Sequence, residues 1–222
     1  MKKNPFLIGL QSARANLIPG LILQVAAVLL IVSYYYIPEV KDGLAIVGVW
    51  QERYGVFFAG VSYLFFCGLI PTLICLFIPS LRPEAPVKAF VFACVFWSTM
   101  GVLVALFYQF QSALFGDGHD LGTLVMKACF DQFVFSAFLS VPFLAIVHVW
   151  KDRNYRWSRV RPMLGRGWYG RLVLPTLVMN WSIWFPSLFV IYSMPVLLQP
   201  HIAGLISGFW SLLCLQIAAR AE

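Results

Sequence analysis

Apolar residues in this chain gather into long runs that are separated by short polar segments. A helix needs about 20 apolar residues to cross a hydrocarbon core about 30 Å thick, and each run comes near or exceeds that length. The pattern predicts six membrane-spanning helices, at residues 17–37, 55–79, 88–111, 125–150, 172–199 and 202–219. We therefore expect an all-α fold, a polytopic transmembrane helical bundle that forms a single membrane domain over residues 1–222.

Two parts of this arrangement admit alternatives. Only the corner Gln199-Pro200-His201 separates the last two predicted spans, so the two could also form one hairpin. The fifth span contains Pro175, Pro186 and Pro195, which bend a helix and free backbone carbonyl groups. The N-terminal stretch Asn4–Asn16 is either a helix on the membrane surface, with its apolar residues on one face, or an unstructured tail.

Composition supports a membrane protein, because 61% of the residues are hydrophobic and only 11% are charged. Ordinary soluble domains have about 25% charged residues. With six spans and an inner N-terminus, thirteen of the sixteen lysine and arginine residues fall on the inner side. Such a bias is typical of the cytoplasmic side. We therefore read the net charge of +7 as an orientation signal, with both chain ends inside and the lipid bilayer, not nucleic acid, as the partner.

The first residues bear on the choice of membrane. The start Met1-Lys2-Lys3 resembles a secretory signal peptide. The apolar run that follows, however, is longer than the apolar region of a cleavable signal peptide, which has about 7–15 residues. We expect this run to be retained as the first helix. Short loops and the lack of an arginine- and serine-rich presequence favour a bacterial plasma (inner) membrane over a mitochondrial or peroxisomal membrane.

The residues that most often bind metals are scattered along the chain. All five cysteines lie in predicted spans without a Cys-x-x-Cys pair, which is typical of thiols that pack in an apolar interior. The three histidines, His119, His148 and His201, belong to three separate segments. We therefore expect no metal and no cofactor.

Polar residues inside predicted spans are the main candidates for function, because a polar group in hydrocarbon needs a partner. Asp131 is the only acid clearly inside a span, Gln132 follows it, and Lys127 lies four residues earlier on the same helical face. In one interpretation Asp131 and Lys127 neutralise each other near the headgroups or tie two helices together. In the other, Asp131 and Gln132 lie at the outer mouth of a polar pathway.

The fifth predicted span holds a second polar candidate, Asn180, on the same side as Trp184. An interhelical hydrogen bond is one interpretation of Asn180. The other is a position on a water-filled cavity, which the helix break at Pro186 would help to form. In the last span, Gly204-x-x-x-Gly208 indicates close helix packing.

These residues also carry a resemblance to a known family. The order Asn180-Trp181-Ser182-Ile183-Trp184-Phe185-Pro186, then Met194-Pro195, then Trp210, resembles the C-terminal signature of the Mpv-seventeen and peroxisomal membrane protein family. Upstream, Asp131-Gln132 looks like that family's Asp-Gln pair, and Gly101 with Phe107-Tyr108 looks like its Gly-Pro-x-x-His-x-Trp-Tyr element. The resemblance covers roughly residues 95–219 and implies a divergent, bacterial member.

The family is linked to membrane permeability, and some members are described as weakly selective channels, so the resemblance implies a related function here. The chain departs from the family pattern at several positions. Leu188 stands where the family has glutamine, Ile191-Tyr192 where it has Asn-Phe, and Gln199 where it has arginine. These departures remove polar groups that would line a conducting path.

We expect a channel- or transport-related membrane protein. Its path would lie between helices, at the main polar or irregular features inside the predicted bundle. The residues expected to line it are Asp131, Gln132, Asn180, Trp184 and Pro186.

The alternative is a non-transporting scaffold or lipid-interacting protein that uses the basic segment between the fourth and fifth spans. The segment carries Arg153, Arg156, Arg159 and Arg161 among tryptophans and tyrosines. A basic residue near an anionic lipid surface gains about 1 kcal/mol, although orientation by positive charge explains much of the same pattern. A membrane enzyme is not expected, because the chain has no His-Glu-x-x-His, Gly-x-Ser-x-Gly or phosphate-binding loop. A Ser–His pair brought together from distant segments stays open, and so does a homo-oligomer.

Overall fold

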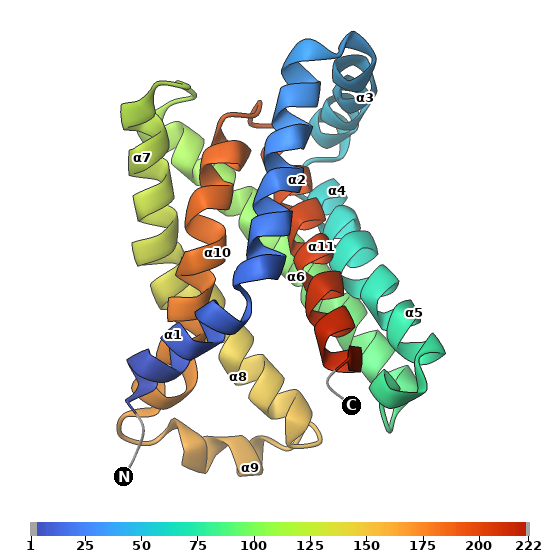
Figure 1. Cartoon of the computed structure of the whole chain (residues 1–222), viewed down its shortest axis with the longest axis vertical. Coiled ribbons are helices and arrows are strands. Elements are labelled where there is room, and N and C mark those ends of the chain that lie inside the picture. Colours follow the sequence, from blue (N-terminus) through green and yellow to red (C-terminus); the bar gives the residue numbers. More distant parts are fainter. Residues whose placement is uncertain (1–3, 221–222) are drawn as a thin grey trace. The chain divides into compact units, whose positions relative to one another are not determined.

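The computed structural model describes residues 4–220, without the side chains of residues 15, 80 and 213–220. The described part therefore excludes Lys2 and Lys3, which contribute to the charge bias, and the side chain of Cys214. The regular elements of the described part are all helical (Figure 1). In chain order they are α1 (Pro5–Ala15), α2 (Leu17–Tyr36), α3 (Pro38–Tyr54), α4 (Val56–Tyr63), the π-helix η1 (Leu64–Leu69), α5 (Ile70–Phe77), the 3₁₀-helix η2 (Pro79–Leu81), α6 (Pro86–Phe115), α7 (Leu121–Phe130), the π-helix η3 (Asp131–Ser140), α8 (Val141–Asp152), α9 (Trp157–Val160), the 3₁₀-helix η4 (Arg161–Leu164), the π-helix η5 (Tyr169–Val173), α10 (Leu174–Tyr192) and α11 (Gln199–Arg220).

Five helical segments in the described part are long and apolar enough to cross a membrane. They follow the first five predicted spans in order, and they are Leu17–Tyr36, Val56–Phe77, Pro86–Phe115, Leu121–Asp152 and Tyr169–Tyr192. The sixth predicted span, 202–219, falls on α11, whose last side chains lie outside the description. An all-helical chain with five such segments fits a multi-pass membrane protein.

The fourth predicted span begins too late at residue 125, because the helix starts at Leu121. Asp120 caps this start: its carboxylate accepts hydrogen bonds from the Thr123 N–H at 3.0 Å and from the Thr123 hydroxyl at 2.6 Å. At about 1.5 Å per residue, Asp131 lies about 15 Å from this helix start, compared with about 9 Å from the predicted start of the span.

The fifth predicted span ends too late at residue 199. Helix α10 stops at Tyr192, and turns at residues 193–198 precede α11. Pro200 is the second residue of α11, where a missing N–H is tolerated because first-turn N–H groups have no partner within the helix. The last two predicted spans therefore correspond to separate helices, and Gln199-Pro200-His201 begins the second instead of forming the corner.

Hydropathy did not predict α3, which fills the connection between the first two spans. Pro38 occupies its first position, Glu39 lies in its first turn and Arg53 in its last turn, as helix-end preferences require. Gly55 ends the helix with φ +59°, a conformation that glycine adopts readily. Because α3 is rich in polar residues, a search for apolar runs passes over it.

Each of the three π-helical stretches ends two residues before a proline: η1 before Pro71, η3 before Pro142 and η5 before Pro175. Proline has no N–H, and its ring collides with the carbonyl four residues back. The preceding turn therefore widens to hydrogen bonds that reach five residues. At the end of η3, for example, the Val141 N–H donates to the Ser136 carbonyl.

Backbone contacts divide the chain into two compact units. Unit 1 consists of Met1–Ile18 and Val125–Phe189, and unit 2 consists of Pro19–Leu124 and Val190–Glu222. Three helices, α2, α7 and α10, run from one unit into the other in sequence.

Unit 1 has a core where η3 and α8 meet η5 and α10. Its fully buried members are small or branched apolar residues, Ala137, Val141, Ala145, Val173 and Leu177. The hydroxyl of Tyr169 donates to the Ala137 carbonyl at 2.7 Å. The widened π-helix thus offers a backbone acceptor to a side chain of the neighbouring helix.

In unit 2, glycines let α4, η1, α6 and α11 approach closely. A methyl group at Gly208 would come within 2.6 Å of the Phe66 carbonyl oxygen, and one at Gly204 within 3.0 Å of the Tyr63 ring. The predicted Gly204-x-x-x-Gly208 packing signal therefore lies at a helix contact. Gly101 of α6 has a similar place, 2.6 Å from the Ala59 carbonyl oxygen by the same measure.

Candidate functional site

The π-helix η3 brings polar side chains of the fourth span onto one face. In an α-helix, side chains five residues apart point about 140° away from each other, whereas the wider turn of a π-helix brings them closer to one face. The Ser136 hydroxyl accordingly donates to Asp131 Oδ1 at 3.3 Å. Gln132 Nε2 donates to the same oxygen at 2.9 Å and lies 3.4 Å from Ser136 Oγ. One carboxylate oxygen thus receives hydrogen bonds from two neighbours.

Helix α10 completes this group of polar residues. Asn180 Nδ2 donates to Gln132 Oε1 at 3.0 Å, and Trp181 Nε1 donates to the Gln132 backbone carbonyl at 3.2 Å. Gln132 therefore uses both ends of its amide, donating to Asp131 and accepting from Asn180. We refer to Asp131, Gln132, Ser136, Asn180 and Trp181 as the Asp131 cluster.

The structure brings together three of the five residues predicted to line a path. Trp184 is half-buried and Pro186 is exposed, and neither forms any of the cluster's hydrogen bonds found in the described part of the chain. Trp181, which the sequence marks only through the family resemblance, and Ser136 are not among the residues predicted to line the path. An α-helical wheel does not group Ser136 with Asp131, and the signal that could have done so is Pro142, which causes the π-helix.

The cluster is buried together with a charged neighbour. Asp131 is 5% exposed, Gln132 1% and Ser136 4%, and Lys127, four residues before Asp131, is 2% exposed. Among the described residues, Lys127 is the buried lysine and Asp131 the buried acid. A buried charge is costly unless it is paired and hydrogen-bonded, so these two side chains are expected to depend on each other.

The arrangement presents a carboxylate, two amides, a hydroxyl and an indole N–H from two helices. Groups of this kind can replace part of the hydration shell of a small ion or polar solute. They can also hold two helices together through hydrogen bonds. The geometry is therefore compatible with both interpretations of Asp131 and Asn180, a polar pathway and a hydrogen-bonded contact between helices.

The basic segment predicted to face lipid lies at the surface of unit 1. Its four predicted arginines are exposed: Arg153 follows α8, Arg156 precedes α9, Arg159 belongs to α9 and Arg161 begins η4. Val160, between the last two, is completely buried. One apolar side chain thus anchors the segment while the guanidinium groups stay accessible.

A tight turn shapes the beginning of this segment. Asn154 and Tyr155 have φ +56° and +58°, which reverses the chain after α8. The Tyr155 ring packs edge-on against Trp150, with ring centres 5.0 Å apart. Burial, and then the negative charge of Asp152, raises the pKa of the Tyr155 hydroxyl. This phenol therefore stays uncharged at neutral pH and adds no charge to the segment.

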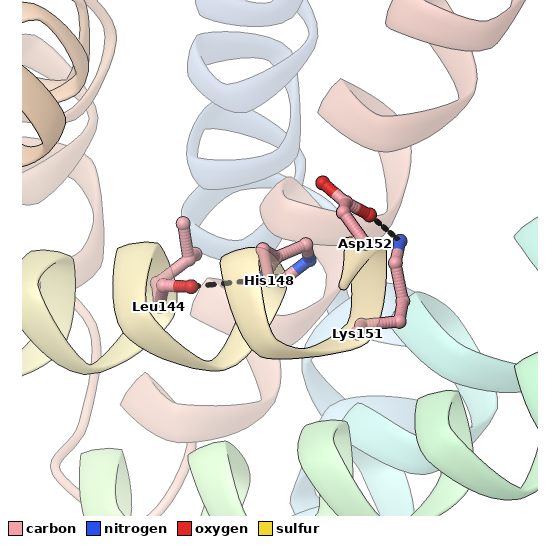
Figure 2. Close-up of polar contacts among 4 residues, drawn as sticks. All are labelled: Leu144, His148, Lys151 and Asp152. Atoms are coloured by element: carbon pink, nitrogen blue, oxygen red, sulfur yellow. Dashed lines mark hydrogen bonds and ion pairs between the residues drawn. The ribbon is translucent and has the colours of Figure 1, made fainter. Parts of the chain in front are cut away.

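The end of α8 uses its polar groups locally (Figure 2). His148 Nδ1 lies 2.9 Å from the Leu144 carbonyl oxygen, which can only accept, so Nδ1 carries the proton. Lys151 Nζ lies 3.6 Å from Asp152 Oδ1, with both side chains well exposed. Such a surface pair contributes little to stability, but it offsets one positive charge and leaves the arginines to dominate the segment.

The N-terminal stretch is helical, so its interpretation as an unstructured tail is wrong. Within α1, the apolar residues Phe6, Leu7 and Leu10 are 47%, 53% and 37% exposed. A methyl group at Gly9 would come within 2.7 Å of the Pro175 carbonyl oxygen, so α1 packs against the start of α10. Figure 1 shows α1 and α9 at the same end of unit 1.

Comparisons of the chain with family models, with curated proteins and with solved structures find no match. Among the described residues, no group of three or more histidine, cysteine, aspartate or glutamate side chains is placed to hold a metal ion. Two polar features of unit 1 are candidates for function: the Asp131 cluster and the exposed basic segment.

Proposed function

We propose that the protein is a multi-pass membrane protein that lets a small polar or charged solute cross the bilayer, with the Asp131 cluster as the polar part of the pathway. The observation that carries this proposal is the burial of Lys127 and Asp131 within a segment that is long and apolar enough to cross a membrane. Ionisable side chains in membrane helices are rare, face the bundle interior or a water-filled cavity, and mark routes for ions or protons.

The resemblance to the Mpv-seventeen and peroxisomal membrane protein family supports the same proposal. Two elements that carry it, Asp131-Gln132 and Asn180-Trp181, are far apart in sequence but share hydrogen bonds through Gln132. We propose membership of this family on the strength of these residues, and with it a link to membrane permeability. The short loops are the feature on which we propose a bacterial plasma membrane as the protein's location.

The part of the cluster around the carboxylate is closed in this structure, since Asp131, Gln132 and Ser136 are at most 5% exposed. Passage of a solute therefore requires the cluster to exchange its internal hydrogen bonds for bonds to water or solute. The π-helix provides a route to this exchange. A shift of η3 to α-helical bonding would leave Ser136 about 140° from Asp131 around the helix and release the hydrogen bond between them.

Flux through reconstituted protein tests the proposal. The purified chain is inserted in proteoliposomes and in planar bilayers, and solute release and conductance are measured with a series of small ions and sugars. We expect flux above that of empty liposomes and at least a tenfold loss with Asp131→Asn, which keeps the size of the side chain and removes its charge.

Asp152→Asn is the matched control, because Asp152 is exposed on the surface of the same helical segment. It should leave flux unchanged. A protein that conducts nothing, or a flux that Asp131→Asn does not alter, would contradict the proposal.

A second function, anionic-lipid binding by a non-transporting protein, is favoured by the exposed arginines of the basic segment. Trp157, which is 54% exposed between Arg156 and Arg159, adds an amphipathic ring suited to the headgroup layer. Each arginine is expected to add about 1 kcal/mol, or about fivefold in affinity, on an anionic surface.

Lipid retention measures this second function. The wild-type chain is compared with a variant carrying Arg156→Gln, Arg159→Gln and Arg161→Gln, in micelles that contain either anionic or zwitterionic lipid. The variant should lose anionic lipid selectively. Arg53→Gln, on α3, is the control, and equal retention by wild type and the triple variant would remove the case for the basic segment.

A further inference from the structure

Unit 2 contains a buried polar group that the proposed function does not use. His201, in the first turn of α11, lies between Ser62 of α4 and Gln51 of α3. Its Nδ1 is 2.6 Å from Ser62 Oγ, and its Nε2 is 2.8 Å from Gln51 Oε1. Gln51 and His201 are 3% and 6% exposed, and Ser62 is half-buried. We refer to these three residues as the His201 triad.

The partners of His201 determine where the protons of the triad lie. Gln51 Oε1 can only accept a hydrogen bond, so Nε2 of His201 carries a proton. A ring buried between neutral partners is uncharged, which leaves a lone pair on Nδ1 to accept the Ser62 hydroxyl proton. The Phe58 ring, 4.7 Å from the imidazole, packs beside it. A serine donating to a histidine that a third group orients is the arrangement of an activated nucleophile.

The position of Ser62 indicates which substrates could reach it. Ser62 lies about 9 Å along the segment Val56–Phe77 at about 1.5 Å per residue, near one end of a membrane-crossing helix. The interfacial layers of a bilayer, where lipid esters lie, extend beyond a core of about 30 Å. Phe57, Val61 and Phe65 on the same helical segment are 76%, 56% and 48% exposed. The surface around Ser62 is therefore suited to a substrate with a long acyl chain.

We propose that the His201 triad is a serine-nucleophile site that hydrolyses a long-chain acyl ester. Ser62 Oγ attacks the ester carbonyl carbon while its proton passes to His201 Nδ1. The tetrahedral adduct then loses the alcohol, whose oxygen takes that proton as its bond to carbon breaks. Water attacks the acyl-serine, gives one proton to His201 Nδ1, and the carboxylic acid leaves as Ser62 Oγ regains the proton. Ser62 and His201 are catalytic residues, and Gln51 is a positioning residue that holds the ring tautomer.

The experiment treats the full chain in detergent micelles with a long-chain alkyl fluorophosphonate and measures the adduct by intact mass and peptide mapping. Wild type should carry one adduct, on Ser62, and Ser62→Ala should carry none. His201→Phe should react at least about 100-fold more slowly than wild type, as expected for the loss of a general base. Ser211→Ala is the control, because Ser211 is a half-buried serine whose hydroxyl donates to the Ser207 carbonyl. Its adduct on Ser62 should form at the wild-type rate.

A folded wild-type protein with no adduct on Ser62 would overturn the proposal, and this measurement does not depend on any variant folding. An adduct that forms equally fast in folded His201→Phe would also overturn it and leave a hydrogen bond between helices as the role of the triad. For Gln51, substitution by methionine should slow labelling and substitution by glutamate, which keeps an acceptor facing Nε2, should restore it. Equal rates in both variants would contradict the positioning role.

Discussion

The Asp131 cluster and the His201 triad are both buried polar groups in a membrane protein, but they differ in charge and in place. The Asp131 cluster contains a carboxylate, follows a buried lysine by four residues and belongs to two segments that are long and apolar enough to cross a membrane. The His201 triad is built from neutral side chains and uses the last turn of α3 and the first turn of α11. One is a site with charged side chains, and the other is a neutral site that includes two helix ends.

The difference shows how burial constrains polar chemistry. A buried charge needs a partner in every state, whether protein, water or solute, so the Asp131 cluster should be sensitive to any change in charge. A neutral network needs only its hydrogen bonds, and the loss of one leaves a smaller penalty. Substitutions that remove a charge should therefore lower the free energy of unfolding more than substitutions that remove a single neutral hydrogen bond.

The largest effect is expected from Lys127→Met, which leaves the Asp131 carboxylate buried without its charged neighbour. The free energy of unfolding should fall by about 3–5 kcal/mol. The double variant Lys127→Met with Asp131→Leu should recover most of this loss, because no uncompensated charge remains. Unfolding in mixed detergent micelles measures both, and a loss under about 1 kcal/mol in the single variant would show that the two charges are independent.

A smaller effect is expected in the neutral site. Gln51→Met keeps the volume of the side chain but leaves the His201 Nε2–H without its acceptor. The free energy of unfolding should fall by about 1–3 kcal/mol. Gln109→Met, at an exposed position on α6, is the control and should change it little. If Gln51→Met proved as damaging as Lys127→Met, charge would not be what distinguishes the two sites.

Hydrogen bonding within the Asp131 cluster should be weaker still. Asn180→Leu removes the donor to Gln132 Oε1, and Trp181→Phe removes the donor to the Gln132 carbonyl. Each should lower the free energy of unfolding by about 0.6–2 kcal/mol, the range for hydrogen bonds between membrane helices. Losses of the size expected for Lys127→Met would mean that Asn180 supports the buried charge directly.

The smallest effect is expected at Asp120, an acid that is exposed to solvent. The Thr123 hydroxyl, and then the Thr123 backbone N–H, hold the pKa of Asp120 below its usual value. Thr123→Val should raise this pKa, whereas Thr123→Ser should keep it low, as an NMR titration of the carboxyl carbon would show. A lowered pKa stabilises the fold above the unfolded-state pKa of about 3.9 and loses that effect as pH falls through the folded-state value. An unchanged pKa in Thr123→Val would assign the shift to the backbone N–H alone.

The sequence predicted the apolar segments and the charged site because both stand out in hydropathy. An acid such as Asp131 is rare in an apolar run, and its neighbour Gln132 follows directly. Asn180 was recognised for the same reason. The contact among these residues was not predictable from α-helical periodicity, because the π-helix before Pro142 changes which side chains share a face.

The His201 triad was not predictable, because none of its members is unusual where it occurs. Gln51 lies in a polar helix that has no long apolar run, and His201 lies beside Pro200, which the sequence alone places in a corner between two spans. Ser62 is one of many hydroxyls that membrane helices tolerate. Only the fold brings the three together, so no pattern along the chain marks them.

Access of water to the Asp131 cluster tests the proposed pathway most directly. In a chain whose native cysteines are replaced by alanine, Ser136→Cys places a thiol in the cluster, and Phe138→Cys places one on an exposed, apolar part of the same π-helix, where Phe138 is 75% exposed. A water-soluble, membrane-impermeant thiol reagent reacts with the thiolate, which forms where water reaches the sulfur. In proteoliposomes the pathway predicts that Ser136→Cys reacts faster than Phe138→Cys. If the thiol at residue 136 reacts no faster than the one at 138, water does not enter the cluster and the proposed pathway is contradicted.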